Sequence, residues 1–360
     1  MSVYILTLIS VCTLCYLAEE YDWPEIDEYD RLKVLHSPDA QKLYFVAACI
    51  LICVAGFRYR GGMDYMAYYG SYKDDIDNLS NSLRTLNEPG FGIIAWIATR
   101  FYDDGAAVIF LSSLIIISLP LIINYRHTGQ LLLTTFLYLT MGGWLGSFNG
   151  IRQYLAASIL FCGYKSLRER NFLKYCSVVF MAFLFHRSAV VFLILYVVVN
   201  REVSIRNTIL IILISVLILL SYDNVFLVAN YIMGAEYSLE EAYTASAVNR
   251  LRVAAAIIPS VVFLYSYYGK TKSESEIFAL NILILRSASS ILAMNSALLY
   301  RINIYVSCFA PLAISELING ISEKNRKVIT TLFVIMYVVM WWYEIYKAGS
   351  LNHFQWIWQR

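Results

Sequence analysis

A polar hexapeptide at residues 148–153, with the sequence FNGIRQ, stands between two long apolar runs. It places a cation and two amides where lipid would otherwise surround the chain. An arginine at the centre of a bilayer costs about 2.5 to 3.5 kcal/mol on insertion scales, so such a residue usually serves a function. The simpler alternative is a short interhelical turn from which Arg152 extends to the lipid headgroups. Further polar residues on the same predicted side favour a site.

Charged and polar side chains gather on one predicted side of the membrane, mostly at the ends of apolar segments. Arginine binds phosphate oxygens through a planar, bidentate fork, so several converging arginines would suit a diphosphate. A carboxylate or histidine beside them could accept the proton of a sugar hydroxyl if its pKa is tuned. The candidate set comprises Arg58, Arg60, Asp64, Glu88, Asn149, Arg152, Gln153, His186, Arg187 and Arg301.

These residues also have simpler structural explanations. His186 lies between two apolar runs and could only cap a tight helical hairpin. Asp64 could pair with Arg58 or Arg60 and merely hold the loop. Arg301 could be an ordinary anchor at the membrane interface. Spacing alone does not decide between these explanations and a site.

The composition is that of a polytopic membrane protein rather than a soluble domain. Of the 360 residues, 59% are hydrophobic and 15% are charged, and the mean hydropathy is +0.59. Apolar stretches of roughly 17 to 25 residues, the length that spans a bilayer as a helix, recur along the chain. The seven cysteines lie in or beside apolar runs and lack metal-binding partners. Neither a disulfide nor a metal site is therefore predicted.

We expect an all-α polytopic membrane protein with about twelve transmembrane helices, forming one membrane domain over residues 1–360. The segment 91–101, after Pro89, is too short to span and fits a re-entrant or interfacial helix. Residues 58–90 and 222–249 are the predicted outward loops. The predicted spans are residues 3–17, 43–57, 105–124, 131–147, 151–167, 172–185, 187–200, 206–221, 251–268, 276–294, 302–319 and 327–346.

Lysine and arginine are more numerous in one set of alternate loops, which the positive-inside rule places in the cytoplasm. Arg152, His186, Arg301 and the C-terminus then face outward. Residues 58–69 and Glu88 also face outward, provided that residues 91–101 do not cross the membrane. If they cross, Arg58 and Glu88 face the cytoplasm instead. The acidic stretch 19–40 favours crossing, because it lacks the positive charge expected inside, whereas the short length of 91–101 favours the outward placement.

Six short motifs follow one another in an order that is found in a known family. They are Phe57-Arg58, Gly62-x-Asp64-Tyr65-x-x-Tyr68, Glu88-Pro89-Gly90-Phe91, the hexapeptide at 148–153, Phe185-His186-Arg187-Ser188-Ala189, and Arg301 with Tyr305. Through them the chain resembles the Wzy-type bacterial polysaccharide polymerases, in particular the EpsG-like branch, over about residues 40–310. Each motif alone is weak, and their order makes the resemblance specific. Met63 and the acidic first loop depart from the family pattern.

The resemblance implies a GT-C-like glycosyltransferase of the bacterial inner membrane, with its active site facing the periplasm. Such an enzyme transfers a growing glycan from undecaprenyl diphosphate to the non-reducing end of an incoming lipid-linked repeat unit, as in O-antigen synthesis. A base must take the acceptor proton while positive charge stabilises the departing diphosphate. The implied partners are undecaprenyl-diphosphate-linked oligosaccharides, membrane lipids and a chain-length co-polymerase. No nucleic acid, cofactor or metal is expected.

For that reaction either Asp64 or His186 is the expected base, and the sequence leaves the choice open. The predicted substrate-binding residues are Arg58, Arg152 and Arg301 for the diphosphate, Glu88, Asn149 and Gln153 for the sugars, and in addition Arg60 and Tyr305. Two other functions compete with this one. An O-antigen ligase uses the same donor but typically has a larger outward loop. A lipid-linked oligosaccharide flippase or other transporter would be expected to show internal repeats and charges at mid-membrane.

Overall fold

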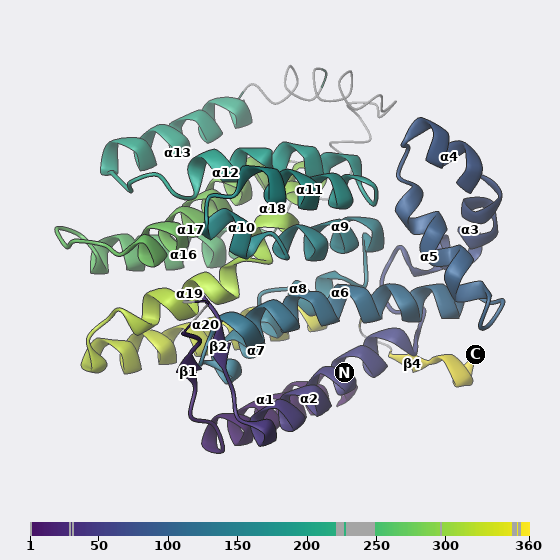
Figure 1. The fold of residues 1–360 in the computed structure, drawn as a ribbon, viewed down its shortest axis with the longest axis horizontal. Helices are drawn as coiled ribbons and strands as arrows, with labels where there is room; N and C mark the ends of the chain where they lie inside the picture. Colours follow the sequence, from purple (N-terminus) through teal and green to yellow (C-terminus); the bar gives the residue numbers. More distant parts are fainter. Residues whose placement is uncertain are drawn as a thin grey trace.

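The structure, a computed structural model, describes residues 2–28, 30, 32–220, 227, 249–295, 297–347, 351 and 354–360. Within these residues the chain is mainly helical, with two small sheets of two strands each, so the predicted all-α membrane fold is confirmed. Many of the helices lie side by side along one direction of the molecule (Figure 1). The elements are α1 (Ser2–Glu20), β1 (Glu25–Ile26), β2 (Val34–Leu35), α2 (Pro38–Gly56), β3 (Arg58–Tyr59), α3 (Tyr65–Asp77), α4 (Leu79–Thr85), α5 (Pro89–Thr99), α6 (Gly105–His127), α7 (Leu131–Thr140), α8 (Gly143–Gly146), α9 (Ile151–Phe161), α10 (Tyr164–Arg168), α11 (Phe172–Phe183), η1 (Arg187–Leu193), α12 (Ile194–Val198), α13 (Ile205–Leu220), α16 (Arg250–Ser266), α17 (Glu274–Leu292), η2 (Ala293–Asn295), α18 (Ala297–Ser307), α19 (Ala310–Asn319), α20 (Glu323–Lys347), β4 (Gln355–Trp356) and η4 (Ile357–Gln359).

Five helices of the described chain, α1, α2, α6, α17 and α20, are long and apolar enough to cross a membrane. A sixth candidate span is the pair α18 and α19, which is bent by 42° at the break between its two parts. The predicted number of about twelve spans is not confirmed, because other predicted spans are divided into short helices. Gly142, with φ +90°, follows the end of α7 and Gly150, with φ +60°, precedes α9. The predicted loop 222–249 lies almost wholly outside the described residues.

Local sequence explains where the long helices begin. The side chain of Asp104 accepts a hydrogen bond from the Ala106 amide at 2.8 Å and caps α6. Ser37 caps α2 in the same way through the Ala40 amide, and Pro38 supplies a helix-compatible first residue. At 1.5 Å per residue, the 23 residues of α6 extend roughly 34 Å, which is enough to cross the hydrocarbon core.

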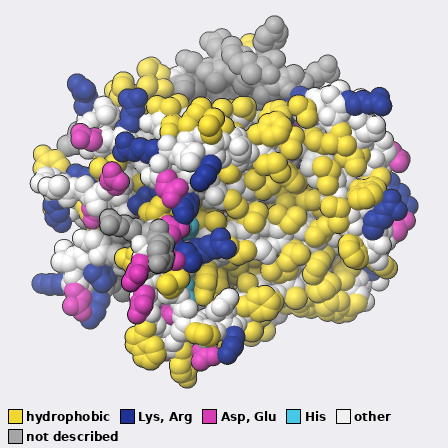
Figure 2. Space-filling view, in the orientation of Figure 1, with side chains coloured by type: hydrophobic (Ala, Val, Ile, Leu, Met, Phe, Trp, Pro, Cys, Tyr) yellow, Lys and Arg dark blue, Asp and Glu magenta, His cyan; other side chains and the backbone are white. Residues whose placement is uncertain are grey.

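A broad apolar surface separates two charged ends of the molecule (Figure 2). Large apolar side chains of the long helices are exposed, for example Ile9, Phe45 and Leu332 at 57%, 67% and 59%. A soluble monomer rarely exposes so much continuous apolar surface. This surface therefore faces lipid, and the two ends face the aqueous phases.

We call one end the motif end, defined by residues 58–69, 88–90, 148–153 and 185–188. The C-terminus lies there too, because β4 pairs antiparallel with β3 and the Arg360 guanidinium contacts Asp104 at 2.8 Å. The 11 residues of α5 extend roughly 16 Å, about half of a hydrocarbon core. The structure thus has the arrangement expected if α5 does not cross.

The acidic stretch 19–40 lies at the opposite end of the molecule. Asp30 forms an ion pair with Lys165, which holds the pKa of Asp30 below its usual value. His36 contacts Asp22 through one ring nitrogen and the Tyr125 carbonyl oxygen through the other, at 2.7 Å for the second contact. The acidic stretch therefore lies on the same membrane side as the basic residue Lys165. The ion pair with Lys165 offsets part of the negative charge of the stretch.

The interior contains two apolar clusters. One joins α1, α2 and α6 with Trp144 and its neighbours, and the other joins α9 to α12 with α16 to α20. Phe185 and Ile304 pack against both clusters. Because His186 directly follows Phe185, the motif end has polar side chains where the two clusters meet.

Candidate functional site

The loop before α3 and the hexapeptide hold each other through reciprocal hydrogen bonds. The Asn149 side-chain oxygen accepts from the backbone amides of Met63, at 2.6 Å, and Asp64, at 3.4 Å. In return the Asp64 carboxylate accepts from the Gly150 amide at 2.8 Å. The side chains of Asn149 and Asp64, two predicted site residues, are therefore bound to backbone amides of this protein. Such bonds fix the two loops against one another.

Gly62 brings the same two loops into close contact. Its φ of +102° lies in a region that only glycine adopts freely. A Cβ at this position would lie 2.4 Å from the Phe148 carbonyl oxygen. Position 62 thus requires glycine for two reasons: its positive φ, and the backbone of Phe148 that packs against it.

Glu88 lies at the centre of the motif end, and its side chain is 16% exposed. Its Oε1 atom accepts from the Arg187 amide at 2.9 Å and lies 2.7 Å from His186 Nδ1. Its Oε2 atom is 3.9 Å from an Arg152 guanidinium nitrogen. The Glu88 segment is held near His186 by a backbone hydrogen bond from the Gly90 amide to the Leu184 carbonyl, at 2.8 Å.

The environment of Glu88 keeps its carboxylate ionised. Burial alone would raise the pKa of Glu88. The contact with His186, the Arg187 amide and the charge of Arg152 outweigh this effect, so that the pKa lies below its ordinary value of 4.5. At neutral pH, Glu88 is therefore a fixed negative charge rather than a proton acceptor.

His186 lies between Glu88 and Gln153. Its Nε2 atom is 2.9 Å from the Gln153 amide nitrogen, and its side chain is 25% exposed. The contact from Nδ1 to Glu88 has the distance of an ion pair, although its direction is not that of an ideal hydrogen bond. If Nδ1 carries the proton facing Glu88, Nε2 carries the lone pair, which is the arrangement of a carboxylate-oriented general base.

Arg152 contacts protein groups rather than extending towards lipid. One terminal nitrogen lies 2.5 Å from the Asp75 carboxylate, and the guanidinium carbon lies 4.9 Å from the centre of the Phe91 ring. The side chain is 30% exposed, and its buried Nε has no hydrogen-bond partner within the described structure. Arg152 is thus oriented by a carboxylate and an aromatic ring, and one donor is left for a ligand.

The sequence interpretation missed Asp75, although a signal was present. Asp64, Tyr68 and Asp75 are separated by four and seven residues, so they fall on one face of a helix. In the structure α3 presents Tyr68 to Phe91, with ring centres 5.3 Å apart. Burial raises the pKa of Tyr68, while the charges of Arg152 and Arg301 lower it.

Arg301 and Tyr305 approach the site from α18. Arg301 is exposed, and its positive charge contributes to lowering the pKa of Tyr68. Tyr305 is fully buried, stacks on Phe192 at 4.4 Å and exchanges a hydrogen bond with the Ser188 hydroxyl at 2.9 Å. Tyr305 therefore supports the turn that follows His186 and does not reach a ligand directly.

Arg58 and Arg60 lie outside this group. The Arg58 side chain is 1% exposed and donates to the Gly61 carbonyl and the Ser113 hydroxyl, both at 3.1 Å, while it stacks on Phe148. Burial lowers the pKa of Arg58 to about 10, so that it still carries its charge at neutral pH. Arg60 is exposed and lies over its neighbour Tyr59. Arg58 is therefore enclosed by protein and stabilises the loop.

The motif end thus combines a carboxylate-oriented histidine with two arginines at one end of a helical bundle. In the part of the chain that the structure describes, no group of three His, Cys, Asp or Glu side chains could hold a metal ion. Fold and site together define a multi-pass membrane protein with a polar centre at one membrane face.

Comparison with known families identifies the class further. The sequence model of the EpsG family matches residues 41–357, so the chain belongs to the EpsG family. This family consists of membrane proteins of the polysaccharide-polymerase type, which agrees with the resemblance found in the motifs. Neither a curated protein nor a solved structure gives a match.

Proposed function

We propose that the protein is a membrane glycosyltransferase that polymerises oligosaccharide repeat units carried on undecaprenyl diphosphate. A growing glycan would move from its lipid diphosphate to the non-reducing end of the next lipid-linked unit. Membership of the EpsG family supports the polymerase class. The observation that carries the mechanism is the Glu88 carboxylate, which contacts both His186 and Arg152. One carboxylate thereby orients a proton acceptor and a cation.

In this mechanism His186 is the general base. The acceptor hydroxyl oxygen attacks the anomeric carbon of the donor sugar, and its proton passes to His186 Nε2 as the bond to the diphosphate breaks. Glu88 holds the ring and stabilises the imidazolium that forms. The substrate hydroxyl takes the position that the Gln153 amide occupies at 2.9 Å. Asp64 is the less suitable base because its carboxylate binds the Gly150 amide.

Positive charge stabilises the departing lipid diphosphate. Arg152 offers its Nε donor, which has no partner among the described residues. The charges of Arg152 and the exposed Arg301 both act on the pKa of Tyr68. Gln153 has a buried side-chain oxygen that finds no hydrogen-bond partner among the described residues, which suits a sugar hydroxyl. Asn149 acts on the substrate only indirectly, because it binds the loop before α3.

The cellular setting belongs to the same proposal. The motif end faces the periplasm of a bacterial inner membrane, and the product is O-antigen or a related polysaccharide. A chain-length co-polymerase is the proposed protein partner. The chemistry assigned to His186 and the arginines requires no divalent metal, so activity should persist in the presence of a chelator.

The test is polymerisation of a synthetic undecaprenyl-diphosphate-linked repeat unit by the purified protein, with chelator present. The wild type should produce a ladder of products, and His186→Ala should lower the initial rate by roughly 10²-fold or more. Glu88→Gln should also lower the rate, because the imidazole loses its orienting charge. Arg187→Gln is the matched control, since the Arg187 contact to Glu88 comes from its backbone amide.

Three outcomes would contradict the proposal. A wild-type protein that forms no ladder with this substrate excludes the polymerase, and glycan transfer to a lipid A core acceptor would instead indicate a ligase. Movement of the lipid-linked unit across the membrane without bond formation would indicate a flippase. A normal rate in His186→Ala would remove the base from the mechanism.

A further inference from the structure

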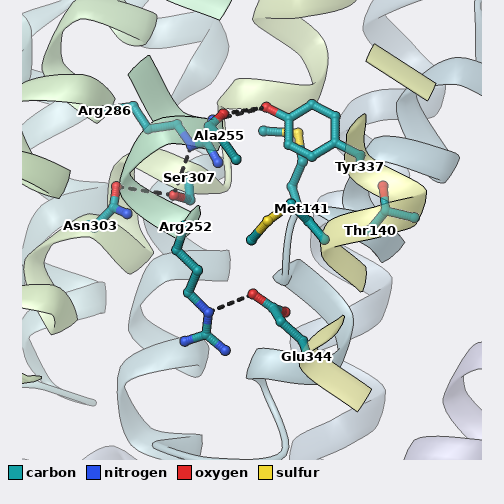
Figure 3. Close-up of a pocket in the computed structure, with 10 residues that line it drawn as sticks. Thr140, Met141, Arg252, Ala255, Arg286, Asn303, Ser307, Tyr337 and Glu344 are labelled. Carbon is teal, nitrogen blue, oxygen red and sulfur yellow. Dashed lines mark hydrogen bonds and ion pairs between the residues drawn. The ribbon is translucent and has the colours of Figure 1, made fainter. Parts of the chain in front are cut away.

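Arg286 is a buried cation outside the site described above. It lies within α17, its residue is 5% exposed, and it faces a cavity lined by α7, α16, α18 and α20 (Figure 3). Its Nε atom donates to the Ser307 hydroxyl at 3.4 Å, and a terminal nitrogen donates to the Tyr337 hydroxyl at 3.3 Å. Both contacts are long and both partners are neutral. No carboxylate of the described residues forms an ion pair with Arg286.

The neighbouring hydroxyl protons are committed elsewhere. Tyr337 donates to the Ala255 carbonyl at 2.9 Å, and Ser307 donates to the Asn303 side-chain oxygen at 3.2 Å (Figure 3). The Asn303 oxygen also accepts from Ser289 at 3.0 Å. The Asn303 amide hydrogens therefore remain as donors beside the cavity, which Asn303 lines.

A second arginine lines the same cavity. Arg252, near the start of α16, forms an ion pair with Glu344 at 2.5 Å (Figure 3). The described residues that line the cavity thus include two guanidinium groups and one carboxylate, so this described lining carries a net positive charge. A buried charge without a counter-ion is costly, and an anion in the cavity would remove that cost.

The size of the cavity limits what can enter. Its volume is about 30 Å³, room for about two water molecules at roughly 10 to 15 Å³ each. Pockets for small organic ligands measure roughly 300 to 1,000 Å³, so a sugar ring is excluded. The positive charge and the small volume together suit a compact oxyanion, such as one phosphoryl group.

The cavity and the candidate site lie on different faces of α18. Asn303 and Ser307 face Arg286, whereas Tyr305 contacts Ser188 beside His186. Residues two positions apart on a helix point roughly 200° apart, which explains this division. Glu344 lies near the end of α20, from which the chain continues to β4 at the motif end. A ligand could thus reach the cavity from the same membrane face.

We infer that Arg286, with Arg252 and Asn303, forms a second anion-binding site that holds a phosphoryl group of a lipid-linked substrate. One lipid diphosphate would be bound near Arg152, and one phosphoryl group of a second would enter this cavity, so that donor and acceptor are held on either side of α18. The identity of this ligand rests on the proposed function. The binding of an anion in this positively charged cavity does not depend on the proposed function.

The test is calorimetric titration of the purified protein in phosphate-free detergent with inorganic pyrophosphate, and in parallel with farnesyl diphosphate. The wild type should bind two equivalents. Arg286→Gln and Arg152→Gln should each bind one, and the double variant none. Arg286→Lys, which keeps the charge, should retain the second equivalent at roughly tenfold weaker affinity. Arg250→Gln is the control, because Arg250 is an exposed arginine at the first residue of α16.

A melting curve without ligand separates this role from a structural one. Arg286→Gln should melt no lower than the wild type in phosphate-free buffer, because it removes an uncompensated charge. Two equivalents bound to Arg286→Gln, one equivalent bound to the wild type, or a marked loss of melting temperature in this variant would each overturn the inference. Farnesyl diphosphate binding without pyrophosphate binding would show that the lipid chain, rather than the phosphoryl group, is recognised, which also overturns it.

The two proposals can fail separately. If the wild type forms a glycan ladder but Arg286→Gln still binds two equivalents, the second site is wrong and the polymerase stands. If the wild type forms no ladder but the binding pattern is as expected, the anion site stands and the polymerase falls.

Discussion

Arg152 and Arg286 are both arginines in the helical part of a membrane protein, yet their surroundings differ in one respect. Arg152 has carboxylates at 2.5 Å and 3.9 Å and an aromatic ring against its face. Arg286 has two hydroxyl groups and a cavity, without an ion pair among the described residues. Arg152 is therefore oriented before any ligand binds, whereas the charge of Arg286 is left uncompensated.

This difference separates two uses of a buried cation. A guanidinium that carboxylates hold in place costs little reorganisation during a reaction, which is what catalysis requires. A guanidinium without a counter-ion gains most from a bound anion, which is what tight binding requires. The motif end would then be the place of chemistry, and the cavity beside α17 the place where a second substrate is held.

The largest effect is expected where the support of the oriented site is removed. Gly62→Ala should destabilise the fold by about 3 kcal/mol, because its φ is unfavourable for alanine and the added Cβ meets the Phe148 carbonyl. Polymerisation should be lost while pyrophosphate binding at Arg286 persists in the protein that still folds. Melting temperature and calorimetric titration measure both effects.

Gly70→Ala is the matched control for this change. Gly70 lies within α3, and a Cβ there would meet nothing within 4 Å. Alanine should stabilise that helix by about 0.5 to 1 kcal/mol. Equal melting temperatures for Gly62→Ala and the wild type would show that the two loops do not depend on this contact.

A smaller effect is expected when Arg152 keeps its charge but loses its main partner. Asp75→Asn should lower the polymerisation rate by roughly tenfold, because Arg152 retains Phe91 and the more distant Glu88 but is less well oriented. Initial rates at saturating substrate measure this loss. Asp74→Asn makes the same change at an exposed neighbour and should leave the rate unchanged. Equal rates for both variants would mean that orientation by Asp75 is unimportant.

The smallest effect concerns the pH dependence of stability. The folded-state pKa of Glu88 lies below its ordinary value of 4.5, so its ionised contacts stabilise the fold above that value. This contribution disappears as the pH falls through the lowered pKa. The wild type should therefore melt above Glu88→Gln at pH 7, and the difference should shrink below pH 4.5. A difference that is constant with pH would show that the charge of Glu88 is not involved.

Much of the membrane architecture could be predicted from the sequence, because the length and composition of an apolar run decide whether it can cross a bilayer. The runs at α2, α6, α17 and α20 all appear as helices close to their predicted ranges. The number of spans could not be predicted in this way, because an apolar run gives no sign of a break. Gly142 divides one such run through a backbone conformation that hydropathy does not report.

The sequence by itself determined that this protein lies in a membrane and that its polar motifs belong together, since polar residues beside apolar runs are costly without a purpose. Only the tertiary structure decided their partners. Arg58 donates to a backbone carbonyl, Asp64 binds an amide, and Glu88 contacts His186, which lies 98 positions further along the chain. Packing sets these distances, and a charge acts on the group that lies within a few ångströms of it.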